Sequence, residues 1–147
     1  MREQAVSRHI ERRPTVTDVK SGIGGIRDVE FLVQGLQLIH AHRHPEIITG
    51  NTLEALSKLE QADILSSPTT QALRQGYSFL RRVEHYLQIL DDRQSHTLPQ
   101  DSYAYEVLAK RILGYEADGA LFQECLQQHL NAIRNAYREH LSFETEP

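Results

Sequence analysis

The stretch that decides the fold is residues 67–91, which read SPTTQALRQGYSFLRRVEHYLQILD. Ser67 followed by Pro68 predicts a helix start, because serine caps a first turn and proline is tolerated within it. From there a helical period continues to Asp91, through Leu73, Gly76, Tyr77, Leu80, Val83, Leu87 and Leu90. A helix of this extent is roughly 36 Å long. It is long enough to be the spine of a helical bundle.

Two shorter helical segments precede this spine. The first is strongly apolar and contains Val29, Phe31, Leu32, Val33, Leu36, Leu38 and Ile39. These positions cover a wide arc, so we expect this helix to be buried on more than one side and to be stopped by Pro45. In the second segment, Asn51 with Glu54 three residues later has the form of a capping box. A short helix is predicted to start there, with Leu53, Leu56 and Leu59 on one face.

Two further helices are predicted after the spine. The pattern that follows SHTLPQD, residues 95–101, ends at Gly114, a residue type typical of helix C-termini. Its apolar positions are Tyr105, Val107, Leu108 and Ile112. Asp118 opens the last helix, with Phe122, Cys125, Leu126, Ile133, Tyr137 and Leu141. No stretch is typical of a strand. The chain is therefore predicted to be an all-α helical bundle of about five helices, with one long central helix and antiparallel neighbours.

Composition narrows the class of protein. The 147 residues suffice for one domain with a real core, and the formal charge of −4 argues against nucleic-acid binding by bulk electrostatics. Cys125 is the only cysteine, which excludes an internal disulfide and a cysteine-rich zinc site. No apolar run approaches the roughly 20 residues needed to cross a membrane. We therefore expect a cytoplasmic protein without a nucleic-acid or membrane partner.

Most of the candidate chemistry lies in residues 18–40, DVKSGIGGIRDVEFLVQGLQLIH. Gly22, Gly24 and Gly25 can bring backbone close to a ligand, and the helix that follows offers unpaired N–H groups. Lys20 and Arg27 on either side add a point charge and a planar fork suited to phosphate. The spacing differs from the dinucleotide fingerprint and from the phosphate loop of nucleotide hydrolases. By spacing alone, an anion site and a plain turn with a helix cap stay equally open.

Two acidic residues accompany these cations at the predicted helix start. Asp28 and Glu30 could favour the positive end of the helix dipole, orient Arg27, or hold a metal ion or a water molecule. The sequence leaves these three roles open.

On the long helix, four charged or titratable residues lie within one turn, namely Arg81, Arg82, Glu84 and His85. Some of them could reach the glycine-rich stretch, although a solvated face with pairs three or four residues apart is the simpler interpretation. The segment DDRQSHT, residues 91–97, is unusually polar. It could either return toward the glycine-rich stretch or simply leave the helix.

Three histidines and the cysteine are weak candidates for chemistry. His40 and His44 have ligand spacing on a helix, but His42 points elsewhere and no third ligand is evident, so we predict no metal site. Histidines in a last turn also suit the helix dipole. Cys125 lies among apolar residues and is predicted to belong to the core.

Three stretches resemble the family of bifunctional glutamine synthetase adenylyltransferase/deadenylylase enzymes. Residues 18–40 resemble the segment after its nucleotidyltransferase fold. NTLEALSKLEQADILS resembles its next helix and turn, and LRRVEHYLQILDDRQSHTLP its long helix and exit. The sister PII-uridylyltransferases share a similar glycine-rich stretch, but the DDRQSHTLP exit favours the glutamine synthetase enzyme. The last stretch is most like its N-terminal half, which removes AMP by phosphorolysis to ADP.

The resemblance implies a domain organisation. Residues 1–17 would be a connecting segment excised from a larger chain, residues 18–143 the helical bundle domain, and residues 144–147 a tail. The transferase fold of this family holds magnesium with a Gly-Ser followed by an Asp-x-Asp pair, and neither motif occurs in this sequence. The fragment alone should therefore be inactive, with no catalytic or metal-binding residue of its own.

The resemblance also implies a site and its ligands. A cleft for nucleotide and phosphate beside the missing nucleotidyltransferase domain would be lined by Lys20, Gly22, Gly24, Gly25 and Arg27. Supporting roles would fall to Asp28, Glu30, Arg81 and Glu84. For residues 91–97, the resemblance favours a structural network that involves Arg93 and His96. The Mg²⁺ ion and ATP or ADP would be held mainly by the missing domain.

The implied partners are glutamine synthetase, the PII signal protein and the nucleotidyltransferase domain of the same chain. The implied function is nitrogen regulation, through removal or addition of AMP on a tyrosine of glutamine synthetase. Two other hypotheses stay open. The chain could be a non-catalytic interaction module that relays the PII signal or docks glutamine synthetase, or it could be a free-standing helical adaptor.

Overall fold

The computed structural model describes residues 17–91 and 96–141. Within these ranges the chain contains five α-helices and no sheet, as the sequence predicts. The helices are α2 (Ile26–His40), α3 (Thr52–Gln61), α4 (Ser67–Asp91), α5 (Ser102–Leu113) and α6 (Gly119–Leu141), with a short 3-10 helix η1 (Pro45–Ile47). None of the helices in the described ranges is both long and apolar enough to span a membrane.

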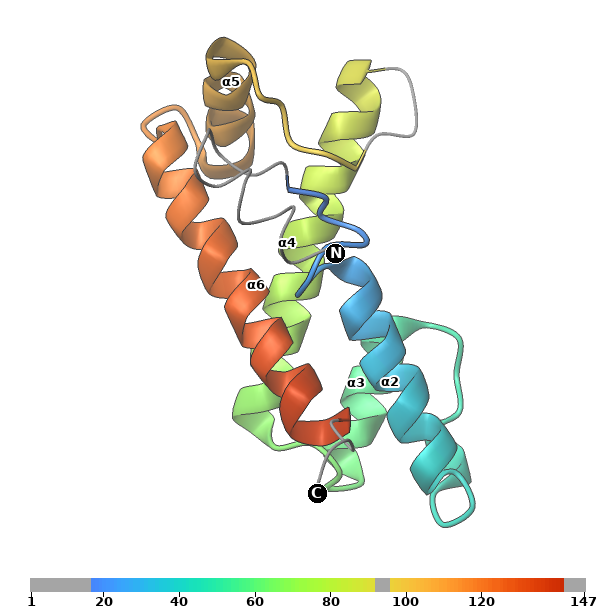
Figure 1. The fold of residues 1–147 in the computed structure, drawn as a ribbon. Coiled ribbons are helices and arrows are strands. Elements are labelled where there is room, and N and C mark those ends of the chain that lie inside the picture. Colours follow the sequence, from blue (N-terminus) through green and yellow to red (C-terminus); the bar gives the residue numbers. More distant parts are fainter. Residues whose placement is uncertain (1–16, 92–95, 142–147) are drawn as a thin grey trace, which may run out of the picture.

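The long helix α4 is the spine of the bundle, as expected. Figure 1 shows α4 rising through the molecule and α6 descending beside it, so the two longest helices are antiparallel neighbours. Helix α2 packs along the lower part of α6, α3 lies against α2 and α4, and α5 covers the upper end. The beginning of α2 therefore lies near the middle of the bundle, close to α4 and α6.

Local capping fixes the starts of three helices where the sequence predicts them. The Asn51 side chain accepts a hydrogen bond from the Glu54 N–H at 2.9 Å and begins α3. Asp101 accepts from the Ala104 N–H at 2.9 Å and begins α5, and Asp118 accepts from Leu121 N–H at 2.9 Å ahead of α6. Each bond satisfies a donor that the first turn leaves unpaired.

The start of α4 differs from the prediction by one residue. Ser66, and not Ser67, is the cap, because its hydroxyl accepts from the Thr69 N–H at 3.3 Å and its carbonyl from the Thr70 N–H at 2.9 Å. Ser67 is already helical and Pro68 is the second helical residue. Proline fits there because a first-turn N–H has no partner within the helix.

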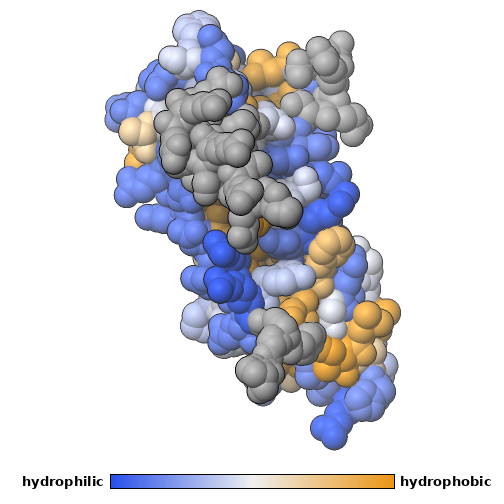
Figure 2. All heavy atoms as spheres, viewed as in Figure 1, coloured by the Kyte–Doolittle hydropathy of each residue, from blue (hydrophilic) through white to orange (hydrophobic). Residues whose placement is uncertain are grey.

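Helix α2 departs from the prediction at its end and on its outer face. It ends at His40, and Pro45 begins η1 instead of stopping the helix. One stripe is buried, with Ile26, Val29, Leu32, Val33 and Leu36. The second predicted face is exposed: Phe31 is 48% exposed, Leu38 84% and Ile39 45%. Figure 2 shows hydrophobic surface in this lower region of the molecule. The expectation of burial on more than one side was wrong, because α3, α4 and α6 all pack on one side of α2.

The core runs along the whole bundle and holds α4 against α6. An aromatic group at its upper end joins three helices: the ring centroid of Phe122 lies 5.9 Å from that of Phe79 and 5.5 Å from that of Tyr105. Cys125 is partly buried and packs against this core, as predicted. The largest fully buried side chains are Ile26, Leu32, Ile47, Leu56, Leu59, Leu65, Leu73, Leu80, Leu108, Phe122, Leu126 and Ile133.

Candidate functional site

The glycine-rich stretch forms a loop that is tied to the chain beyond α4. Asp18 forms an isolated antiparallel bridge with Thr97. The Val19 N–H donates to the His96 carbonyl at 2.8 Å, and the Leu98 N–H donates to the Thr17 carbonyl at 2.9 Å. Two backbone hydrogen bonds therefore fix the entry to the loop before Lys20 is reached.

The carboxylate of Asp18 shapes the first turn of this loop. One oxygen accepts from the backbone N–H groups of Lys20 at 2.9 Å and Ser21 at 3.0 Å, and the other accepts from the Ser21 hydroxyl at 3.0 Å. Burial by itself raises the pKa of Asp18, but these hydrogen bonds and the charge of His96 outweigh it and hold the pKa below 3.8. The turn is therefore stabilised by the ionised form of the residue.

An Asp18→Asn chain is expected to be less stable than the native chain by about 1 kcal/mol at pH 7, because it loses charge-assisted hydrogen bonds. The folded pKa of Asp18 lies below its unfolded value, so this stabilisation is present above the unfolded pKa and is lost as the pH falls through the folded one. Urea unfolding at pH 7 and at successively lower pH values measures the gap between the two chains. The gap should narrow in acid, as the pH falls through the lowered pKa of Asp18, and a constant gap would contradict this role.

The N–H groups at the start of α2 donate hydrogen bonds to carbonyl groups of the loop itself. Ile26 N–H donates to the Val19 carbonyl at 2.9 Å, Arg27 N–H to the Lys20 carbonyl at 2.9 Å, and Asp28 N–H to the Gly25 carbonyl at 3.1 Å. Of the two interpretations that the spacing leaves open, these paired N–H groups favour the turn with a helix cap over a cradle of free backbone donors. Any anion bound here would be held by side chains.

The three glycines allow backbone segments to approach each other more closely than a side chain would permit. A Cβ at Gly22 would lie 2.6 Å from the Asp18 carbonyl oxygen, and one at Gly25 would lie 2.7 Å from that of Val19. Gly24 has a φ of 78°, and a Cβ there would lie 2.3 Å from the carbonyl oxygen of Leu130 on α6. The glycines thus let the loop turn tightly and let it touch α6.

The two cationic residues, Lys20 and Arg27, have neighbouring backbones in this loop. Because the Arg27 N–H donates to the Lys20 carbonyl, the backbones of the two residues are fixed relative to each other. Lys20 is partly buried and Arg27 is exposed. Among the residues that the structure describes, no carboxylate lies within 4.0 Å of either charged group. The loop therefore presents two cations whose charge is not neutralised by a direct ion pair within the described ranges.

The two acids of the first turn have partners inside the fold. Asp28 accepts from the Gly24 N–H at 2.7 Å, which closes the glycine loop onto α2. Glu30 accepts from the hydroxyl of Tyr77 on α4 at 3.0 Å. Burial raises the pKa of Tyr77, and the charge of Glu30 adds to this effect. Neither acid forms an ion pair with Arg27.

A cluster of polar side chains extends along α4 from Tyr77 to Glu84 and reaches His96 beyond the helix. The guanidinium of Arg81 lies 5.9 Å from the centroid of the Tyr77 ring, and its Nη1 is 3.0 Å from Oε1 of Glu84. Glu84 is only 5% exposed. Its other oxygen lies 3.1 Å from Nδ1 of His96. Nδ1 is buried, and this contact with Glu84 does not have the geometry of a hydrogen bond.

The structure thus joins three of the four predicted supporting residues, Glu30, Arg81 and Glu84, through Tyr77. His96, one of the two residues of the expected polar network, belongs to this cluster. The other, Arg93, lies outside the described residues. Arg82 donates instead to the Ile112 carbonyl on α5 at 2.8 Å, and His85 is exposed. The roles of Tyr77 and Asp18 were missed. For Asp18, its spacing from Ser21 is a local signal of the turn.

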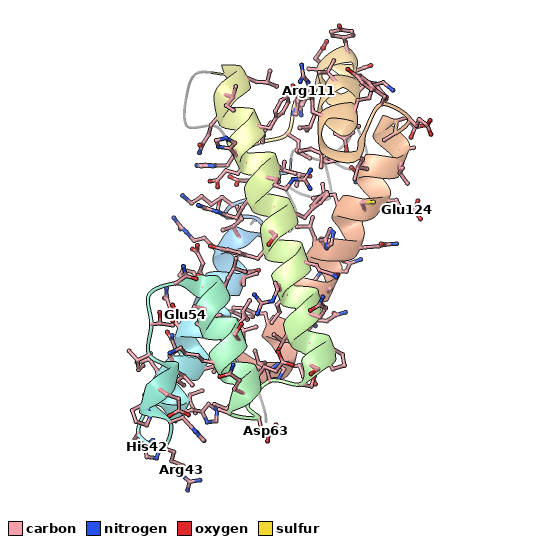
Figure 3. All side chains as sticks on the ribbon, turned by 180° about the vertical axis from the view of Figure 1, so that it is seen from behind. His42, Arg43, Glu54, Asp63, Arg111 and Glu124 are labelled. Carbon is pink, nitrogen blue, oxygen red and sulfur yellow. The ribbon has the colours of Figure 1, made fainter. Side chains whose placement is uncertain are left out.

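The histidines at the end of α2 lie away from this cluster. Nδ1 of His44 is 3.1 Å from Oε2 of Glu46. His42 and Arg43 project from the turn after α2, as Figure 3 shows from behind. Within residues 17–91 and 96–141, no three histidine, cysteine or acidic side chains come together in a way that could hold a metal ion.

Comparison with known proteins finds a matching family model and similar proteins. The family model described as GlnD PII-uridylyltransferase matches residues 1–141. The chain is 41% identical to a protein of Xanthomonas campestris pv. campestris (strain B100), over 94% of the chain and 14% of that protein. It is 40% identical to one of Rhodopseudomonas palustris (strain HaA2), over 88% of the chain and 13% of that protein. Both are named bifunctional glutamine synthetase adenylyltransferase/adenylyl-removing enzyme. The chain spans about one seventh of the length of these relatives.

Proposed function

Because the chain belongs to the GlnD PII-uridylyltransferase family, we propose that it is the helical domain of a bifunctional glutamine synthetase adenylyltransferase/adenylyl-removing enzyme. In this proposal it lines the cleft for nucleotide and phosphate beside a nucleotidyltransferase domain of the same polypeptide. The half concerned is the N-terminal one, which removes AMP from glutamine synthetase. Its regulation would involve the PII signal protein.

One observation supports this role above the others, namely the placement of Lys20 and Arg27. Their backbones are hydrogen-bonded to each other, and no carboxylate neutralises either charge directly within the described residues. A phosphate group supplies the negative charge and the acceptor oxygens that such a pair lacks. The hydrogen-bonded loop fixes the backbones from which the two side chains extend, so a ligand would meet two cations that start from neighbouring positions.

The proposed chemistry places these cations beside an attacking inorganic phosphate. An oxygen of that phosphate forms a bond to the phosphorus of AMP while the bond from phosphorus to the tyrosine oxygen of glutamine synthetase breaks. The products are ADP and the free tyrosine, whose oxygen takes up the proton that the hydrogen phosphate loses. Lys20 and Arg27 orient the phosphate and reduce its repulsion from the AMP phosphoryl group. Both effects require the cleft to be closed by the second domain, since water screens exposed charges.

The described residues do not fit a magnesium site. The carboxylates of Asp28 and Glu30 are engaged by the Gly24 N–H and the Tyr77 hydroxyl, and Glu84 is engaged by Arg81 and His96. Magnesium requires several oxygen ligands in near-octahedral geometry. In this proposal the ion and the nucleotide base are therefore bound by the other domain, and no step depends on a metal held by this chain.

The test is phosphorolysis of adenylylated glutamine synthetase by the intact enzyme that contains this chain. Arg27→Ala is expected to lower kcat/KM by about 100-fold, because one preorganised charged donor is lost. Lys20→Ala should act in the same direction. The matched control is Arg43→Ala, which removes an arginine beyond the other end of α2, about 22 Å away along a 15-residue helix.

The control should retain activity within about twofold, and the isolated chain should show none. Full activity of both Lys20→Ala and Arg27→Ala would contradict the cleft assignment. That result would favour the second candidate, a non-catalytic module that docks glutamine synthetase or relays the PII signal. The observation in favour of this candidate is the exposed apolar face of α2, with Phe31, Leu38 and Ile39.

A further inference from the structure

Glu84 is a buried carboxylate without a role in the chemistry described above. It is 5% exposed and lies on α4, with Arg81 at 3.0 Å from one oxygen and His96 at 3.1 Å from the other. Burial of a carboxylate is costly unless opposite charges accompany it. The burial of Glu84 is explained if its carboxylate is needed to hold either Arg81 or His96 in place.

Of these two partners, His96 is the one that is hydrogen-bonded to the glycine-rich loop. The side chain of His96 faces Glu84, while its backbone carbonyl accepts the hydrogen bond from Val19, the residue before Lys20. Val19 in turn accepts from the Ile26 N–H at the start of α2. A continuous path of contacts therefore leads from the Glu84 carboxylate on α4 through His96 to Val19 at the start of the loop, and from Val19 to Ile26 at its end.

We propose that Glu84 is a positioning residue that fixes Lys20 through His96, and so sets the affinity for phosphate. The inference rests on the proposed function, because it gives Glu84 a role in placing one of the cations of that cleft. Glu84 does not touch the ligand. It attracts the His96 imidazole, the His96 carbonyl holds Val19, and Lys20 follows directly in the chain.

The experiment is a double-mutant cycle in the intact enzyme, with the rate of phosphorolysis measured against the concentration of inorganic phosphate. Glu84→Gln preserves the shape of the side chain and removes its charge. It is expected to lower kcat/KM for phosphate by about tenfold, since small misplacements of a binding group are costly. In a Lys20→Ala background the same change should cost less than about twofold, because the group that it positions is gone.

The matched control is Glu124→Gln, which removes a charge from the exposed face of α6 that is labelled in Figure 3. A second readout does not depend on activity. Hydrogen exchange followed by mass spectrometry should show faster exchange for peptides that cover residues 17–26 in Glu84→Gln, and native exchange in Glu124→Gln.

Each outcome is decisive for one of the two assignments. Unchanged exchange of residues 17–26 in Glu84→Gln would overturn the positioning role, as would losses that add fully in the double mutant. Full activity of Lys20→Ala would overturn the link from Glu84 to phosphate, and full activity of Arg27→Ala as well would overturn the proposed cleft. Faster exchange in that case would still show that Glu84 fixes the loop, so the two failures are told apart.

Discussion

A Gly24→Ala chain is expected to lose about 3 kcal/mol of folding free energy, as the sum of two effects. Gly24 has a φ of 78°, a left-handed conformation that costs other residues roughly 1–2 kcal/mol. The added Cβ would also lie 2.3 Å from the carbonyl oxygen of Leu130. That atom belongs to the backbone of α6, so no side chain can rotate away, and the loop or the helix must shift. Overpacking of this kind costs roughly 1–3 kcal/mol.

The measurement is thermal and urea unfolding followed by circular dichroism, with Gly50→Ala as the matched control. A Cβ at Gly50 would meet nothing within 4 Å, and its φ is not in the left-handed region. We expect the control to remain within about 0.5 kcal/mol of the native chain. The Gly24 variant should melt roughly 10 °C lower. Equal melting temperatures for the two variants would show that Gly24 does not hold the loop against α6.

The fold was predictable because its main signals are local. The period of α4 can be read from its own 25 residues, and it needs no knowledge of the neighbours. The caps Asn51, Asp101 and Asp118 each bond to an N–H group three residues later, and such short-range bonds leave a sequence signature. The choice between Ser66 and Ser67 as the cap of α4 was wrong because either serine fits the same pattern.

The burial of α2 was not predictable in the same way. Periodicity shows which residues share a face, but it does not show how many neighbours are present to cover that face. Phe31, Leu38 and Ile39 are apolar and lie on a helix, as expected, yet α3, α4 and α6 all pack against the opposite stripe. Apolar residues are common on protein surfaces, so composition alone does not decide burial.

For the candidate site, the sequence indicated the residues better than their roles. Lys20 and Arg27 do flank a tight glycine loop. The sequence left the glycines open between backbone donors to an anion and a plain turn with a helix cap. The structure shows a tight turn in which Gly24 lies against the Leu130 carbonyl, far along the chain on α6. The pairing of Glu84 with His96 also depends on tertiary structure, although the polarity of residues 91–97 hinted at a network. Contacts between distant elements leave no local pattern to read.

A Phe122→Ala chain is expected to lose roughly 3–5 kcal/mol, the range measured when buried aromatic side chains are truncated. Phe122 is 0% exposed, and its ring meets Phe79 of α4 at 5.9 Å and Tyr105 of α5 at 5.5 Å, the latter edge to face. Removing it leaves a cavity where α4, α5 and α6 meet. The three helices are tied together by other contacts and cannot fully collapse into that space. Urea unfolding gives the loss directly.

The matched control for this change is Phe31→Ala, the same substitution on the exposed face of α2. Phe31 is 48% exposed, so its truncation removes less buried area and leaves no internal cavity. Alanine also has the higher helix propensity, by about 0.5 kcal/mol, which offsets part of the lost contact. The isolated chain should therefore change by less than about 1 kcal/mol. If both substitutions cost the same, α2 would have to be buried on two sides in solution, as its sequence alone suggests. A large difference between them would show that the position of the neighbouring helices, and not the apolar pattern, decides which phenylalanine stabilises the bundle.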